Sequence, residues 1–183
     1  MRRNRRVQVD YLDDATLPAL QDALSRTPYH VLHFTGHGAF TGKEGKLCFE
    51  NPTGQSELTG PKELRPLLIG QRDLRLIVLS ACQSAKTSGL DAFDSVATGL
   101  LQADLPAVLA MQFSILDVSA IELARVFYAE LARGRAPEEA LRQTRLALRH
   151  LDETRSPDAR RFDWGVPALY VRAPGLRLID PAR

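Results

Sequence analysis

The chain has 183 residues, of which 44% are hydrophobic and 25% charged, and its formal net charge is +2. This length suits one domain with short tails, and the composition is that of an ordinary globular protein. The small net charge gives no sign of direct nucleic-acid binding, and two cysteines are too few for a disulfide scaffold. No run reaches the roughly 18 apolar residues of a membrane span, and residues 1–6 lack the apolar stretch of a signal peptide. These features predict a cytoplasmic protein.

The first part of the chain predicts a strand, a helix and a second strand. Residues 6–10 alternate polar and apolar side chains, which predicts a short, half-exposed strand. A helix follows to Thr27, with Asp14 or Thr16 as its cap and Pro18 in its first turn. Residues 30–35 are the next strand, and the segment Gly36-His37-Gly38 closes it. This order is typical of a right-handed parallel crossover.

The middle of the chain contains its most continuous apolar strand. Residues 39–58 are polar and rich in glycine, which predicts a hairpin at the sheet edge with a strand over residues 46–50. A short helix capped by Thr59 follows. Residues 74–82 then run through Leu, Ile and Val and end in Ser80, Ala81 and Cys82. Such a run predicts a strand buried on both faces of a parallel sheet.

The rest of the chain alternates predicted helices and strands, as an α/β fold does. Helices are expected over residues 92–103, 117–131 and 137–151, and strands over 106–111 and 164–171. Asp117 is expected to cap the second of these helices, and Gly134 to end it.

Two of the predicted strands end in residues that could carry out chemistry. One ends at His37 and the other at Cys82. If these strands are neighbours in a parallel sheet, they lie about 5 Å apart and their carboxyl ends point the same way. His37 and Cys82 would then face each other at one edge of the sheet.

A cysteine nucleophile needs such a neighbour, because a free thiol is only a few per cent thiolate at neutral pH. His37 could take the thiol proton, and the backbone N–H groups of Gly38 and Cys82 could stabilise an oxyanion. Glycines on both sides of the histidine would allow a turn with positive φ. Taken singly, the histidine could be structural and the cysteine a small core residue, but together they favour a dyad. His33 is expected to be packed or hydrogen-bonded, and no metal or cofactor is expected.

Several segments together resemble the CHAT domains of the caspase-like cysteine peptidases, relatives of separase and the gingipains. They are residues 33–38 (HFTGHG), 79–84 (LSACQS), 104–111 (DLPAVLAM) and 162–170 (FDWGVPALY). The resemblance implies a caspase-hemoglobinase-like three-layer sandwich, with a mostly parallel central sheet and helices on both faces. It also implies His37 and Cys82 as the catalytic dyad, with the Gly38 N–H in the oxyanion hole.

The resemblance also implies a domain over residues 7–172, with tails at 1–6 and 173–183. Domains of this family have two strands and a helix before the histidine strand, whereas this sequence predicts one strand and one helix there. The first central strand is therefore expected to come from residues upstream of Met1, in a larger protein, or from a partner chain.

The expected function is that of a cysteine endopeptidase cutting a protein or peptide substrate, regulated by an upstream sensor domain or a partner chain. Relatives that cleave after Arg or Lys use an acidic pocket, for which Asp91, Asp94 and Asp117 are the candidates here. Helix capping is the alternative role for Asp94 and Asp117. The alternative function is a catalytically silent interaction module. A nucleotide-binding domain is weaker, because no phosphate-binding glycine motif follows any predicted strand.

Overall fold

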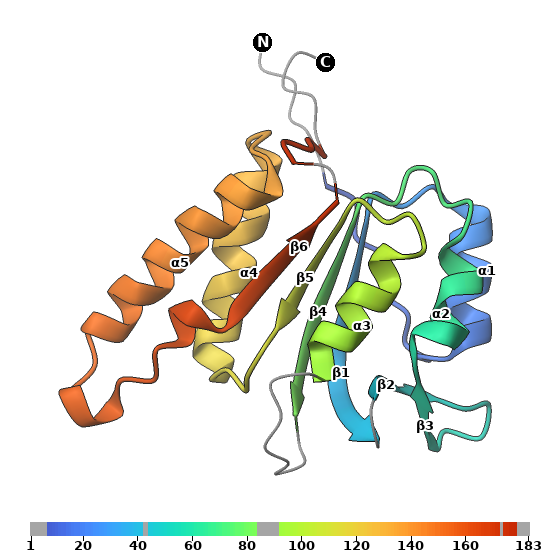
Figure 1. Ribbon diagram of the computed structural model, residues 1–183, viewed down its shortest axis with the longest axis horizontal. Helices are drawn as coiled ribbons and strands as arrows, with labels where there is room; N and C mark the ends of the chain where they lie inside the picture. The colour runs from blue at the N-terminus through green and yellow to red at the C-terminus, as the bar shows by residue number, and fades with distance from the viewer. Residues whose placement is uncertain (1–6, 42–43, 84–91, 173, 179–183) are drawn as a thin grey trace.

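The structure is a computed structural model that describes residues 7–41, 44–83, 92–172 and 174–178. The side chains of residues 81–83 and 92–95 lie outside this description. Figure 1 shows one sheet with helices on both of its faces.

The sheet has six strands in the order β3-β2-β1-β4-β5-β6 within the described residues. The strands are β1 (Val31–Thr41), β2 (Glu44–Glu50), β3 (Ser56–Thr59), β4 (Leu76–Gln83), β5 (Ala107–Met111) and β6 (Pro167–Val171). The predicted α/β class is therefore confirmed.

The prediction of a mostly parallel sheet is wrong, because the sheet is mixed. β4 runs parallel to β1 and β5, whereas the other pairs, β1 with β2, β2 with β3 and β5 with β6, are antiparallel. At one end, β1 turns back directly into β2 as a hairpin. At the other, two helices separate β5 from β6. The second helix brings the chain back to the end of the sheet where β5 finishes, so β6 runs antiparallel to β5.

The helices form a layer on each face of the sheet. α1 (Leu17–Arg26), α2 (Pro61–Leu68) and α3 (Ala92–Leu101) pack on one face, and α4 (Asp117–Ala132) and α5 (Pro137–Glu153) on the other. β4 lies between these layers, with Ile77 and Leu79 in one apolar core and Leu76 and Val78 in the other. This alternation explains why the β4 run is continuously apolar.

Several predicted boundaries are corrected by the structure. β1 does not end at Gly36 but continues through His37 to Thr41, because its last residues pair with β2. The cap of α2 is Gly60 rather than Thr59, and the Glu63 carboxylate accepts the Gly60 N–H at 2.9 Å.

The sequence predicted the cap of α1 correctly but not the cap of α4. Thr16 caps α1 as predicted, with its hydroxyl accepting the Ala19 N–H at 3.2 Å. Asp117 is the first residue of α4 and Leu116 occupies the cap position, so the predicted Asp117 cap is wrong. The carboxylate in the first turn still favours the helix dipole.

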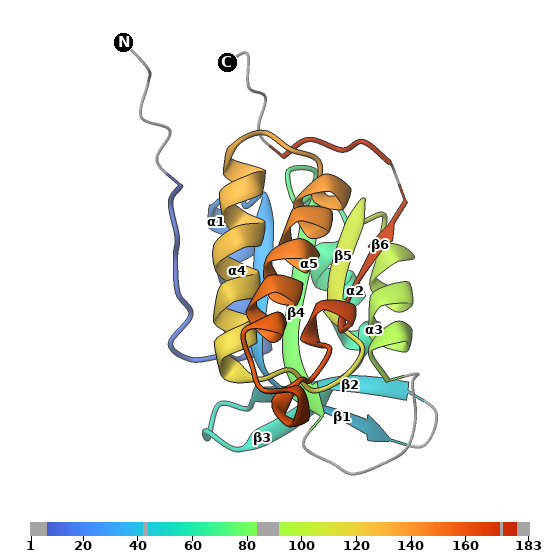
Figure 2. The same ribbon diagram turned by 90° about the vertical axis from the view of Figure 1, so that its left-hand side faces the viewer.

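The predicted strand at residues 6–10 is wrong for its described part. Val7 and Val9 are 67% and 61% exposed and lie in no strand. Figure 2 shows this segment running down the outside of the molecule. β1 pairs with β2 only from Gly38 onward, so within the described residues the outer edge of its first seven residues has no strand beside it.

None of the described helices is both long and apolar enough to cross a bilayer.

Candidate active site

His37 and Cys82 occupy opposed positions on neighbouring parallel strands. The register of β1 and β4 pairs Val31 with Leu76 and, six residues later, His37 with Cys82. Strands in a sheet lie about 4.8 Å apart, so the two backbones meet within one strand spacing near the carboxyl ends of both strands. The backbone therefore places the two residues next to each other, as the sequence predicted. The Cys82 thiol lies outside the described side chains.

The register depends on contacts at the far end of the two strands. The His30 carbonyl accepts hydrogen bonds from the Arg75 N–H at 3.0 Å and from the Leu76 N–H at 3.3 Å. These bonds align the start of β4 with the start of β1. A slip of one residue would move each apolar side chain of β4 from one core to the other, so the packing of the two cores favours the same register.

The glycines beside His37 have a different role from the one predicted. Both lie within β1, and neither is among the described residues with positive φ. A Cβ atom on Gly36 would come within 3.1 Å of the Phe34 ring, so Gly36 leaves room for that side chain. Gly38 is buried and has register partners on both sides, Leu47 of β2 and Gln83 of β4.

His33 and His37 project from the same face of β1, because they are separated by four residues of extended chain. His37 is exposed to solvent. His33 is hydrogen-bonded, as predicted: its Nδ1 lies 2.9 Å from the Tyr128 hydroxyl of α4, and the two rings are 5.7 Å apart. The His33 side chain remains partly exposed, but its packing against Tyr128 removes part of its hydration, and this desolvation lowers the pKa of His33. Burial also raises the pKa of Tyr128.

The lowered pKa of His33 predicts a loss of stability in mild acid. The unfolded chain takes up a proton on this histidine near pH 6.5, while the folded chain resists protonation. The free energy of unfolding should therefore fall as the pH drops from about 7.5 through 6.5 to 5.5. Urea unfolding at these pH values should show a shallower dependence for His33→Gln than for the wild type. Exposed His30 supplies the control, and equal slopes for the wild type, His30→Gln and His33→Gln would contradict the prediction.

Exposed apolar side chains gather around the start of α4, a feature that the sequence analysis did not single out. They are Phe113, Leu116, Val118 and Ile121. From His33 to His37 the strand advances about 13 Å, which corresponds to about nine residues of helix. Since Tyr128 is level with His33, the first turns of α4 are level with His37 on the same face. The sequence does contain a signal for this exposed patch. Val118 and Ile121 lie on a different face of the helix from the buried Leu123 and Phe127, so the helix carries apolar side chains beyond the face that packs on the sheet.

The three acidic candidates are described to different extents. Asp91 lies outside the described residues, and so does the side chain of Asp94 in α3. Asp117 is exposed in the first turn of α4, at the edge where β5 ends. Of the three, Asp117 is the one whose side chain the structure describes, and it lies at the same end of the sheet as His37.

Comparison with known proteins supports one assignment. The family model described as the CHAT domain matches residues 1–173. A search of curated proteins found no match. The family match spans nearly the whole chain and includes both strands that carry His37 and Cys82. This family is related to the caspase-like peptidases, and the chain is a member of the CHAT domain family.

Proposed function

We propose that this CHAT domain is a cysteine endopeptidase, with Cys82 as its nucleophile and His37 as its general base. The observation that carries the proposal is the register that sets these two residues opposite each other, at the carboxyl end of β4 and in the second half of β1. Reactive groups of α/β folds gather at this edge of a sheet. The proposed substrate is a protein or peptide, selected with the help of a sensor domain or partner chain.

The proposed reaction proceeds in two steps. His37 takes the Cys82 thiol proton, and the thiolate attacks the carbonyl carbon of the scissile peptide bond. The C–N bond breaks, the imidazolium returns the proton to the leaving amine, and a thioester remains on Cys82. Water activated by His37 then hydrolyses the thioester and restores the thiol. The backbone N–H groups of Gly38 and Cys82 are the proposed donors to the oxyanion in both steps.

The surroundings of His37 support a substrate with both apolar and basic character. Val118 and Ile121 are exposed beside the proposed site and offer an apolar contact. Asp117 is exposed on the same helix end and offers a carboxylate to a basic side chain. Asp91 and Asp94 remain candidates for the same role.

This proposal predicts a preference for cleavage after a basic residue. Fluorogenic peptides with Arg or Lys before the scissile bond should be cleaved at least about 10-fold faster than those with Ala or Asp, because a charge-assisted contact contributes about 1.5–3 kcal/mol. Asp117→Asn should reduce this ratio if Asp117 forms the pocket. Equal rates for all four peptides would contradict the basic preference and leave the dyad itself to be tested separately.

One observation favours a second function, that of a catalytically silent interaction module. Gly38 has register partners on both sides, so this residue lies within the sheet rather than at a strand end. An N–H that is used in a ladder cannot also stabilise an oxyanion. A silent module predicts no cleavage of any peptide in a diverse library, whereas the endopeptidase predicts discrete cut sites that disappear in Cys82→Ala.

A further inference from the structure

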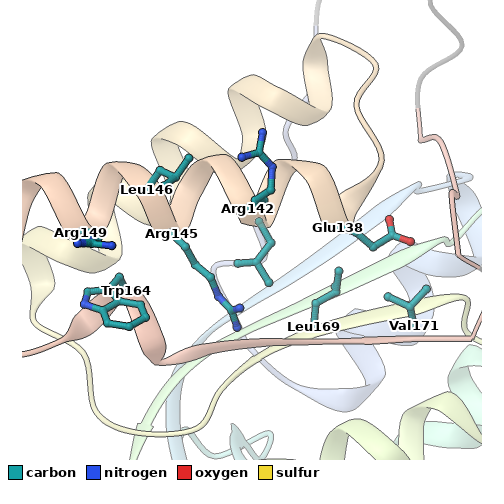
Figure 3. Close-up of a pocket in the computed structure, with 9 residues that line it drawn as sticks. Glu138, Arg142, Arg145, Leu146, Arg149, Trp164, Leu169 and Val171 are labelled. Atoms are coloured by element: carbon teal, nitrogen blue, oxygen red, sulfur yellow. The ribbon is translucent and has the colours of Figure 1, made fainter.

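A groove lies between α5 and β6, the edge strand at the opposite end of the strand order from β3. It has a volume of about 460 Å³. Figure 3 shows side chains from α5 and from the segment containing Trp164 and β6 facing each other across it. Its apolar surface is made by Leu141, Leu146, Trp164, Leu169 and Val171, and three arginines of α5 line the same groove.

The β6 edge of the groove offers backbone groups that no other described strand pairs with. The Val166 carbonyl accepts the Gln112 N–H at 3.0 Å, and the Arg172 N–H donates to the Pro106 carbonyl at 2.8 Å. Backbone groups of alternate residues in a strand point to opposite sides, so those of Leu169 and Val171 point away from β5. In the described part of the chain no other strand pairs with this edge. β6 can therefore accept one more strand.

Several arginines of the groove and its rim have no carboxylate partner among the described residues, although Arg142 pairs with Glu139 at 2.8 Å. Arg145 donates to the Pro167 carbonyl at 2.7 Å and forms no ion pair there. Arg160 and Arg161, which precede Phe162, are exposed and likewise form none within the described chain. Arg149 pairs with Glu153 at 3.0 Å, but both are exposed and such a pair is weak. An acidic ligand would complement this rim.

Phe162 lies beside the groove residue Trp164, and its backbone conformation is unfavourable for a phenylalanine. Its φ is 57° and its ψ 31°, in the left-handed region, and its side chain is 64% exposed. The ring lies edge-on to Trp164, with 6.5 Å between ring centres. An exposed phenylalanine in strained backbone contributes nothing to a core, and strain of this kind gathers at binding sites.

A buried carboxylate holds this loop in place. Asp152, 4% exposed, accepts the Arg161 N–H at 2.9 Å and the Phe162 N–H at 3.3 Å. Arg155 donates to the same carboxylate at 3.3 Å and to Ser119 at 3.0 Å. The aromatic pair is thus presented on a rigid support, which lowers the entropy lost on binding.

At the other end of the groove, one polar atom lacks a partner. The Oε1 atom of Glu138 accepts the Gly175 N–H at 2.8 Å, whereas Oε2 is buried without a hydrogen bond in the described structure. Figure 3 shows the Glu138 side chain extending towards the groove beside Leu169 and Val171. A buried carboxylate oxygen requires a donor. The groove therefore has two distinct ends, one that suits acidic groups and one that suits a donor.

We propose that this groove binds an extended acidic segment of a partner protein, which adds to β6 as a further strand. Acidic side chains of the segment meet Arg145 and Arg161, an aliphatic or aromatic side chain packs against Phe162 and Trp164, and a donor reaches Glu138. Trp, Phe and Arg gathered in this way are the residue types that dominate protein interfaces. The binding does not depend on catalysis.

A fluorescein-labelled octapeptide tests the proposal with the full chain. The peptide alternates glutamate with leucine and phenylalanine and ends in lysine, and its binding is measured by fluorescence anisotropy. Phe162→Gly should weaken binding at least 10-fold while the urea midpoint stays equal or rises, because glycine adopts the left-handed backbone without strain. Ile69→Ala, an equally exposed apolar position outside the groove, should bind as the wild type does. Arg160→Gln with Arg161→Gln should weaken binding and reduce its salt dependence.

Two altered peptides separate the contributions of backbone and charge. Methylation of alternate backbone nitrogens and replacement of glutamate by lysine should each abolish binding. The proposal is overturned if the wild type does not bind the peptide, if Phe162→Gly binds as well as the wild type, or if the lysine peptide binds equally. Concentration-dependent dimers that release the bound peptide would also overturn it, by assigning the groove to a second copy of the chain.

Discussion

Cleavage of the best peptide substrate from a library should be lost in Cys82→Ala and equally in His37→Ala. Each change should reduce kcat/KM on the order of 10⁴-fold or more, because a nucleophile and its base act as a unit. For the same reason, the double variant should be no worse than either single variant. The half-buried Cys48 in β2 supplies the matched control, and Cys48→Ala should keep full activity.

Circular dichroism should show that all four variants remain folded, because His37 is exposed and alanine is compatible with the end of β4. Cleavage that survives in Cys82→Ala at more than a few per cent would rule out Cys82 as the nucleophile. Cleavage that survives in His37→Ala but not in Cys82→Ala would support Cys82 as the nucleophile and rule out His37 as its general base.

The largest effect on stability is expected from Phe127→Ala in α4. Phe127 is 0% exposed and lies in the core between the sheet and α4 and α5. Truncation removes its buried ring and leaves a cavity, which should lower the free energy of unfolding by about 3–5 kcal/mol. Urea denaturation monitored by circular dichroism measures the change.

Ile121→Ala on the same helix is the control for Phe127→Ala. Ile121 is 69% exposed, so its truncation should change the free energy of unfolding by no more than about 0.5 kcal/mol. A loss below about 1 kcal/mol for Phe127→Ala would contradict the packing of α4 on the sheet. If Ile121 contacts substrate as proposed, its truncation should raise KM without this loss of stability.

The central part of the fold follows from local patterns. β4 was predictable because a strand buried on both faces must be apolar at every position, as Leu76 to Leu79 are. The neighbourhood of His37 and Cys82 followed from one further assumption, that their strands are parallel neighbours. The structure has this pairing, and the His30 carbonyl that aligns the two strands has no signature in the sequence.

The sheet directions were harder to predict because they depend on connections rather than on strands. The two helices predicted between residues 111 and 164 already implied that the last strand starts at the end of the sheet where the preceding strand finishes. The apolar pattern of a strand, however, does not indicate in which direction the strand runs. The continuation of β1 past Gly36 depends on β2, which lies beside it as a hairpin partner. A glycine pair that suggests a turn is equally compatible with extended chain when a partner strand is available.

The exposed residues at the groove were not predictable, because exposure of an aromatic side chain is a property of the whole structure. The sequence predicts a strand over residues 164–171 that includes Trp164, whereas β6 begins at Pro167 and Trp164 lies in a short turn of 3₁₀-helix, Asp163–Gly165. The carboxylate of Asp152 accepts the Phe162 N–H from ten residues away, just before this turn. Contacts of this kind are set by tertiary packing.

The coupling of His37 to Cys82 is tested most directly by the rate at which iodoacetamide alkylates each cysteine at neutral pH. A free thiol reacts slowly there because it is mostly protonated. The proposed dyad predicts that Cys82 reacts at least about 10-fold faster than Cys48, and that His37→Ala removes this advantage while His33→Gln retains it. Mass spectrometry of the labelled peptides gives both rates from one sample. A Cys82 rate that equals that of Cys48, or that is unchanged in His37→Ala, would contradict the dyad.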